Sequence, residues 1–258
     1  MRNPRLLPLL FGLTAATALL GGCRHDGDSQ PTVGAITFAL DNRVGTQPLA
    51  LDGTAYTTPG GETFTVSTFK YYISNLQLTK ADGSTYAAPG EYHLIDASKP
   101  TSISFTISNV PTGDYRGVSF VVGVDSTTTK GDPLALPGDL NPANAMYWAW
   151  ATGHIFLKLE GTVTSASNKP LTCHIGGYRL PYSAIVTAAP SLGGNPLPVR
   201  ADRTPTVRLS ADVLKLFNGP NTFTLNAFPT TMMPSASSVK VAQNYAAGMF
   251  TVQRIDAN

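Results

Sequence analysis

Cysteine and charged residues are both scarce in this chain of 258 residues. Only two cysteines occur, and 13% of the residues are charged. If Cys23 carries a lipid, Cys173 has no partner for an intramolecular disulfide. The fold must then be stabilised by a hydrophobic core, and the segment 33–258 is long enough to form one.

Common enzyme motifs are also absent from the sequence. The chain contains no Gly-x-Ser-x-Gly, no His-Glu-x-x-His and no glycine-rich nucleotide-binding loop. It has no cluster of lysine and arginine of the kind that binds nucleic acids. We therefore expect a protein that is not an enzyme and has no nucleic-acid partner.

The N-terminal segment has the features of a lipoprotein signal peptide. Arg2 and Arg5 precede an apolar run over residues 6–20, which is too short to span a membrane comfortably. Two glycines then precede Cys23. This order predicts that residues 1–22 are removed and that Cys23 receives the lipid. The alternative is an ordinary secretory signal with a cysteine at this position by chance.

Removal of the signal peptide leaves a chain without net charge. Loss of Arg2 and Arg5 reduces the 18 basic residues to 16, which equals the number of acidic residues. Residues 23–32 are polar and predict a flexible tether. Membrane attachment would come from the lipid rather than from a basic patch. We expect a lipid-anchored protein of the bacterial cell envelope, and Arg24 after the cysteine favours the outer membrane, with the protein facing the periplasm or the surface.

The remaining sequence predicts an all-β fold. Short runs with alternating apolar residues are separated by turn residues, and the longest run covers residues 62–79. Helix signals occur at residues 210–217 and 235–246, and residues 127–144 form a long irregular loop rich in proline, glycine and aspartate. Residues 33–258 are therefore predicted to form one antiparallel β-sandwich with long loops and one or two short helices.

Both tryptophans of the chain lie in the stretch 141–161, NPANAMYWAWATGHIFLKLEG. If this stretch is one strand, five alternate residues share a face: Met146, Trp148, Trp150, Thr152 and His154. Sulfur, indole and imidazole together indicate a metal or redox surface, with Met146 and His154 as possible ligands. The alternative is that the tryptophans only fill the core and that His154 lies at the surface.

His174 is the histidine with the best case for metal binding. It lies in the strand-like run 171–178, where Leu171, Cys173 and Ile175 would share one face and His174 the other. Cys173 is then expected to be a buried, small hydrophobic residue. A structural histidine without a metal is the alternative.

Two further groups of residues could either bind a metal ion or have only a structural role. Asp125 and Asp139 flank the long loop and could bind a hard cation such as Ca²⁺, or they could cap turns. Met232 and Met233 are thioethers suited to Cu(I), but an adjacent pair is also compatible with ordinary packing.

Seven short segments of the chain resemble the MbnP-like family in their order and spacing. The segments are Phe69–Leu78 (FKYYISNLQL), Val122–Ser126 (VGVDS), Gly138–Pro142 (GDLNP), Met146–Trp150 (MYWAW), Lys158–Gly161 (KLEG), His174–Gly177 (HIGG) and the tail around Tyr245 and Phe250. The resemblance extends from about residue 35 to residue 250.

The resemblance implies an exported β-sandwich protein associated with copper. Its partner would be a di-haem protein similar to cytochrome c peroxidases, which in relatives oxidises a tryptophan to kynurenine. Trp148 and Trp150 are the matching positions for oxidation, and His174 is the matching histidine. The sequence departs from the family in two respects, because it has no histidine near Asp41 and no Trp-x-His pair.

Two other functions remain open at this stage. Tyr147, Trp148 and Trp150 could form a flat platform that stacks on carbohydrate or another ligand. The protein could also be a structural lipoprotein whose tryptophans belong to the core and which binds no metal. The platform requires exposed indoles, whereas the structural role predicts that both indoles are buried.

Overall fold

The computed structural model describes residues 32–150 and 153–257, apart from the side chain of Pro89. The predicted signal peptide, the lipidation at Cys23 and almost all of the predicted tether lie outside the described residues, as does Thr152. The strands are β1 (Val33–Val44), β2 (Gln47–Pro48), β3 (Ala55–Thr57), β4 (Thr63–Lys80), β5 (Thr85–Asp96), β6 (Ser104–Pro111), β7 (Gly113–Val122), β8 (Tyr147–Trp148), β9 (Gly153–Thr164), β10 (Lys169–Gly176), β11 (Val186–Ala188), β12 (Leu197–Val199), β13 (Thr206–Asp212) and β14 (Phe250–Asp256). The α-helices are α1 (Ser126–Thr129) and α2 (Ala236–Gly248), and five 3₁₀ turns occur: η1 (Pro100–Ser102), η2 (Pro133–Ala135), η3 (Gly138–Leu140), η4 (Pro142–Asn144) and η5 (Val213–Leu216).

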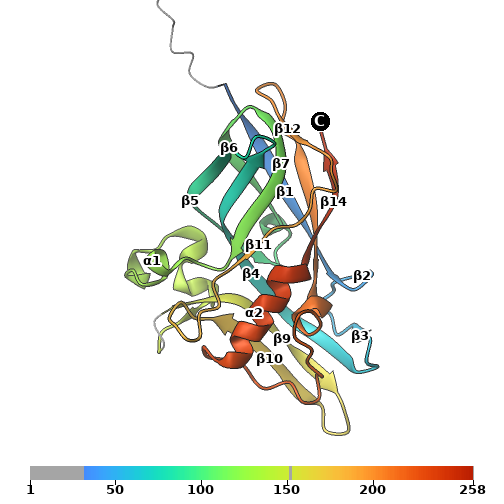
Figure 1. Ribbon diagram of the computed structural model, residues 1–258. Helices are drawn as coiled ribbons and strands as arrows, with labels where there is room; N and C mark the ends of the chain where they lie inside the picture. The colour runs from blue at the N-terminus through green and yellow to red at the C-terminus, as the bar shows by residue number, and fades with distance from the viewer. Residues whose placement is uncertain (1–31, 151–152, 258) are drawn as a thin grey trace, which may run out of the picture. The chain divides into compact units, whose positions relative to one another are not determined.

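The strands form two sheets, which confirms the predicted all-β class (Figure 1). In the first sheet the order is β14-β13-β1, and both β2 and β6 pair with the free edge of β1. β1 and β13 are parallel, whereas the other pairs of this sheet are antiparallel. The second sheet is antiparallel throughout and runs β10-β9-β4-β7-β11, with β3, β5, β8 and β12 attached to it.

β4 organises the second sheet because its two halves have different neighbours. The first half pairs with β9 and β3, and the second half pairs with β7 and β5. Between the halves, Asn75 has a φ of +49° and the pairing register shifts after Ser74. Such a bulge bends a strand and increases its twist. The 18-residue strand can therefore contribute to two differently oriented parts of the sheet.

The hydrophobic core lies between the two sheets. Tyr71 of β4 contacts Phe250 of β14 with 5.6 Å between ring centroids, and its hydroxyl donates to Asn42 of β1. α2 packs near β10 and β11, where the Tyr245 hydroxyl donates to the carbonyl of Ala184. Cys173 is fully buried, as predicted, and burial raises the pKa of its thiol far above the usual value.

The structure tests the two helices that the sequence predicts. The second helix is confirmed, since Ser235 caps α2 by accepting a hydrogen bond from the amide of Ser238. The first is wrong in its limits, because Ser210 lies in β13 and the turn η5 is capped by Asp212 instead. None of the helices within 32–150 and 153–257 has the length and hydrophobicity needed to cross a membrane.

The long loop between β7 and β8 is less irregular than expected. It contains α1 and three 3₁₀ turns, η2, η3 and η4. The carboxylate of Asp125 accepts hydrogen bonds from the amides of Thr127 and Thr128 at the start of α1. The Asp139 carboxylate accepts from the amide of Leu94. Asp125 therefore has the turn-capping role that was the alternative to cation binding, whereas Asp139 connects the loop to β5 and caps no turn.

Candidate functional site

The tryptophan-rich stretch forms a hairpin, so the prediction of a single strand is wrong. The chain reverses direction between Trp148 and Gly153, which are opposite each other in the pairing of β8 with β9. Tyr147 is likewise opposite His154. Because opposite residues share a face and neighbours alternate, His154 lies with Tyr147 on one face and Met146 lies with Trp148 on the other. Because of this turn, Met146 and His154 lie on opposite faces and not on the shared face that a single strand would give them.

His154 is buried and fixed through both of its ring nitrogens. Nδ1 is 3.0 Å from the hydroxyl of Thr129, and Nε2 is 3.1 Å from the carbonyl of Leu140. The edge-on rings of Tyr72 and Tyr147 flank the imidazole. Burial lowers its pKa and favours the neutral form. The side chain is 1% exposed, so the expectation of a surface histidine is wrong, and metal coordination by His154 would require one of these hydrogen bonds to break.

A row of polar side chains crosses the outer face of the second sheet beneath the long loop. Asp96 of β5 is opposite Lys70 of β4, Lys70 is opposite Lys158 of β9, and Lys158 is opposite His174 of β10. Opposite residues on adjacent strands point the same way. The four side chains therefore form one continuous row, which we call the polar row.

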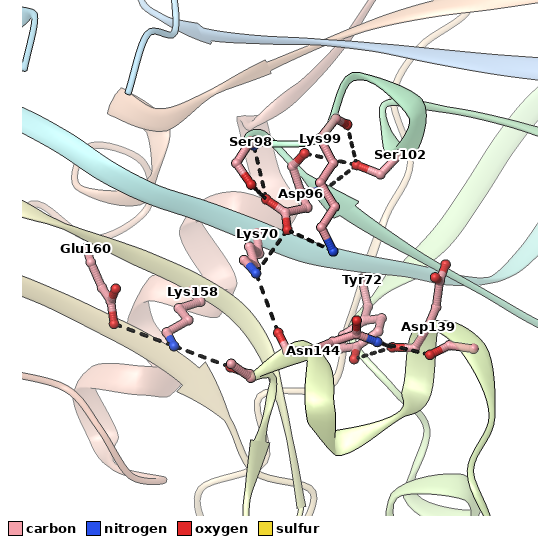
Figure 2. Close-up of polar contacts among 12 residues, drawn as sticks. Lys70, Tyr72, Asp96, Ser98, Lys99, Ser102, Asp139, Asn144, Lys158 and Glu160 are labelled. Atoms are coloured by element: carbon pink, nitrogen blue, oxygen red, sulfur yellow. Dashed lines mark hydrogen bonds and ion pairs between the residues drawn. The ribbon is translucent and has the colours of Figure 1, made fainter. Parts of the chain in front are cut away.

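The polar row holds the loop that leads into β8 (Figure 2). The ammonium of Lys70 is 2.9 Å from the Asp96 carboxylate and also donates to the carbonyl of Asn144 at 3.5 Å. The ammonium of Lys158 donates to the carbonyl of Ala145 at 3.3 Å. The ammonium groups of two partly buried lysines thus bind successive carbonyl groups just before the tryptophan hairpin. Their like charges face each other and are stabilised by these acceptors.

His174 closes the polar row and contacts a carboxylate. Its Nε2 is 2.8 Å from Oε1 of Glu160, and Lys158 lies 3.5 Å from the same oxygen. The backbone amide of His174 donates to the carbonyl of Thr231 at 2.7 Å. Burial is the main cause that lowers the pKa of His174, while the hydrogen bond to Glu160 acts in the opposite direction. The backbone of His174 is therefore bound to the segment at Thr231, while its imidazole contacts the partly exposed carboxylate of Glu160.

The three residues predicted as metal ligands do not form one site in this conformation. Met146 is fully buried and on the opposite face of the hairpin from His154, while His174 belongs to the polar row. Across residues 32–150 and 153–257, no group of three or more histidine, cysteine, aspartate or glutamate side chains is placed to hold a metal ion. The His174–Glu160 pair offers one nitrogen and one oxygen, which is an incomplete donor set for copper.

The two tryptophans are in contact but differ in environment. Trp148 is 5% exposed and Trp150 is 61% exposed, with 5.6 Å between their ring centroids and an angle of 39° between their planes. The Nε1 of Trp148 is buried without a hydrogen-bond partner among the described residues. An unpaired buried donor of this kind costs about 1–3 kcal/mol. Since Tyr147 faces away from Trp148, the three aromatic residues do not form the flat platform that carbohydrate binding would use.

Gly176 allows Trp148 to reach its buried position. A Cβ atom on this glycine would lie 2.8 Å from Cζ3 of Trp148 and 2.6 Å from the carbonyl oxygen of His154. Either distance is too short for a carbon atom, so only glycine fits here. Trp148 also lines a pocket of about 240 Å³. The other lining residues are Gly153, Gly177, Tyr178, Arg179, Leu180, Tyr182 and Pro234.

Sequence reasoning did not find the polar row. Lys70 and Lys158 are separated by 88 positions in the chain, and each looks like an ordinary solvent-exposed lysine in a strand. A signal was present, because each lysine interrupts an apolar run and lies inside one of the segments that carry the family resemblance. Their meaning depends on strand pairing between β4 and β9, which the sequence alone does not specify.

Comparisons with known proteins agree with the architecture. The sequence model of a family described as MbnP matches residues 33–234. A solved structure, MbnP from Methylosinus trichosporium, is similar with a TM-score of 0.50 and 18% sequence identity. The match covers 73% of this chain and 78% of that protein. No curated protein matches the sequence.

Proposed function

The chain belongs to the MbnP family, and we propose that it is a redox partner protein of the bacterial cell envelope and not an enzyme. On this proposal a lipid on Cys23 anchors it to the outer membrane, facing the periplasm or the surface. Its partner is a di-haem protein similar to cytochrome c peroxidases, and the residue that the partner oxidises is a tryptophan.

The contact between Trp148 and Trp150 is the observation that carries this proposal. Tryptophan is among the most easily oxidised side chains, and Trp150 presents most of its surface to an approaching protein. The Trp150 indole would lose two electrons and two protons for each oxygen atom that it gains from water, and a peroxide reduced at the haem of the partner would accept them. Trp148, in ring contact with Trp150, would supply an electron transiently while Trp150 is oxidised.

Oxidation is expected to persist at Trp150 rather than at Trp148. An indole that loses an electron becomes a radical cation, and it is stabilised when Nε1 releases its proton to an acceptor. Nε1 of Trp148 has no acceptor among the described residues and lies in an apolar environment that disfavours charge. Trp150 is exposed to water, which can take the proton and supply oxygen for later steps.

Mass spectrometry on protein purified from its native host tests this proposal. Trypsin releases the peptide 131–158, which contains both tryptophans. We expect the mass shift of an oxidised tryptophan, mapped by fragmentation to Trp150, in the wild type and not in a strain that lacks the di-haem partner. A Trp150→Phe variant is the matched control. Two unmodified tryptophans in protein from the host with its partner present would rule the proposal out.

For copper binding, we propose only His174 of the three predicted ligands. Of the predicted ligands, His174 is the one whose side chain already faces a second donor, the carboxylate of Glu160. Nitrogen and oxygen donors suit Cu(II), and further ligands would have to come from a rearranged hairpin or from the partner. The copper content of the wild type and of a His174→Ala variant, measured on the samples used for mass spectrometry, tests this part. Equal copper in both would remove His174 as a ligand.

A further inference from the structure

A groove beside the tryptophan hairpin combines two cations with apolar and aromatic walls. Its volume is about 620 Å³, within the usual range for small-molecule sites. The lining residues are Lys130, Gly131, Asp132, Pro133, Leu134, Pro142, Tyr147, Ala149, Tyr178 and Arg179. We propose that this groove binds an organic anion with a flat apolar body, whose carboxylate is held between Lys130 and Arg179.

The two cations share one aromatic ring and lack a carboxylate partner. The ammonium of Lys130 is 5.7 Å from the centroid of the Tyr178 ring, and the guanidinium carbon of Arg179 is 5.1 Å from it. Neither side chain forms an ion pair with any residue in 32–150 or 153–257. Both cations lie near the same ring and line the same groove, so a carboxylate bound in that groove would be attracted by both.

The acidic residue of the groove does not neutralise this pair. Asp132 lines the groove, but its carboxylate accepts a hydrogen bond from the amide of Leu134 at 2.9 Å and caps η2. Because two cations and one carboxylate line the groove, its lining keeps a net positive charge. A second pocket that Tyr178 lines also contains Arg179 but not Lys130. The geometry thus places the anion in the larger groove, where both cations are available.

The walls of the groove determine the shape of the ligand body. Tyr178 and Tyr147 supply two flat rings, and Pro133, Pro142 and Leu134 supply apolar edges. The Leu134 side chain is 89% exposed, so it gains burial when a ligand covers it. A flat apolar body contacts these surfaces without displacing a side chain from the core. Neither Trp148 nor Trp150 lines this groove, so ligand binding there does not depend on the redox proposal.

Isothermal titration calorimetry on the purified full chain tests the proposal with four probes. 2-Naphthoate has the flat body and the carboxylate, 2-naphthamide has the same body without charge, decanoate has a flexible lipid-like body, and acetate has no body. We expect 2-naphthoate to bind more tightly than the other three. Absence of 2-naphthoate binding, or equal affinity for 2-naphthamide, would overturn the proposal. Tighter binding of decanoate would overturn the flat body and assign the groove to a lipid carboxylate.

Charge-removing variants locate the site. Arg179→Gln and Lys130→Gln each remove one cation from an exposed position, and each is expected to weaken 2-naphthoate binding by roughly tenfold, as for loss of one charged hydrogen bond. Lys215→Gln removes an exposed cation that lines neither pocket beside Tyr178, and it should bind like the wild type. Unchanged affinity in both groove variants would contradict the proposal. Near-UV circular dichroism verifies that the variants are folded.

Discussion

The two faces of β4, β9 and β10 have opposite chemistry although they are built by alternate residues of the same three strands. The inner face is apolar and at most 1% exposed: Phe69, Tyr71, Ile73, Leu157, Leu159, Cys173 and Ile175. The outer face carries Lys70, Lys158 and His174. The inner face packs in the core between the sheets, whereas the outer face lies beneath the loop that precedes the tryptophan hairpin.

This difference separates the stability of the fold from the positioning of the site. On the inner face, burial of apolar surface is non-directional, and any residue of similar size and hydrophobicity can substitute. On the outer face, each lysine must reach one particular carbonyl group or carboxylate. We infer that the inner face holds the sheets together and that the polar row fixes where Trp148 and Trp150 lie.

The largest effect is expected from Lys70→Met. The Asp96 carboxylate is 2% exposed, and loss of Lys70 at 2.9 Å leaves Lys99, which is 3.8 Å away and 58% exposed, as its cation. Breaking a buried pair in this way destabilises a protein by about 3 kcal/mol or more. Lys158→Met is the matched control, because its carboxylate partner Glu160 is 36% exposed and the loss should stay within about 1 kcal/mol. Urea unfolding of both variants measures the difference, and equal losses would refute the distinction.

A smaller loss is expected where the hairpin meets the inner face, in Gly176→Ala. The new Cβ would meet the His154 carbonyl at 2.6 Å and the Trp148 ring at 2.8 Å. Forcing a methyl group into a filled space costs about 2 kcal/mol. Gly117→Ala, in β7, is the control, since its Cβ would meet nothing closer than 3.5 Å. If the two variants unfold at the same urea concentration, close packing of Trp148 against Gly176 does not limit stability.

The inner face could be predicted from the sequence, and the outer face could not. Alternation around Phe64, Val66 and Leu76 identified β4, and the pattern at Leu171 and Ile175 placed Cys173 correctly in the core. These predictions succeed because the period of two depends only on neighbours within one strand.

The candidate site depends on features that no local pattern contains. The reversal between Trp148 and Gly153 moved His154 away from Met146, although the two are spaced as if on one face of a strand. The polar row requires the pairing of β4 with β9, which lies far from β4 in sequence. Lys130 and Arg179 lie near the same Tyr178 ring only because the long loop returns to the segment after β10.

The buried histidines are expected to make stability depend on pH in a defined window. Burial lowers the pKa of both His154 and His174 below the unfolded value of about 6.5. The unfolded chain therefore binds more protons in this range, so stability is complete above pH 6.5 and decreases as the pH falls through the folded pKa values. Unfolding free energies measured by urea titration between pH 8 and pH 5 should follow this course.

The His154→Gln variant measures how much His154, as opposed to His174, contributes to the pH dependence of stability. It removes the histidine that is held through both ring nitrogens, and the slope of stability against pH should become shallower. His174→Gln should change the slope less, because Glu160 beside His174 favours the protonated form. A stability that rises as the pH falls from 6.5 to 5 would contradict the sign of both shifts.

The smallest effect on stability is expected from Trp150→Phe, which tests whether the exposed indole serves the fold. Trp150 is 61% exposed, and such surface substitutions usually change stability by less than about 0.5 kcal/mol. Trp148→Phe replaces a buried indole with a smaller ring, leaves space in the core and should cost more. Fluorescence of the same variants reports the environments directly: Trp148 alone should emit at shorter wavelength than Trp150 alone. A loss above about 1 kcal/mol in Trp150→Phe would mean that this indole is structural, and its exposure would then no longer point to a partner.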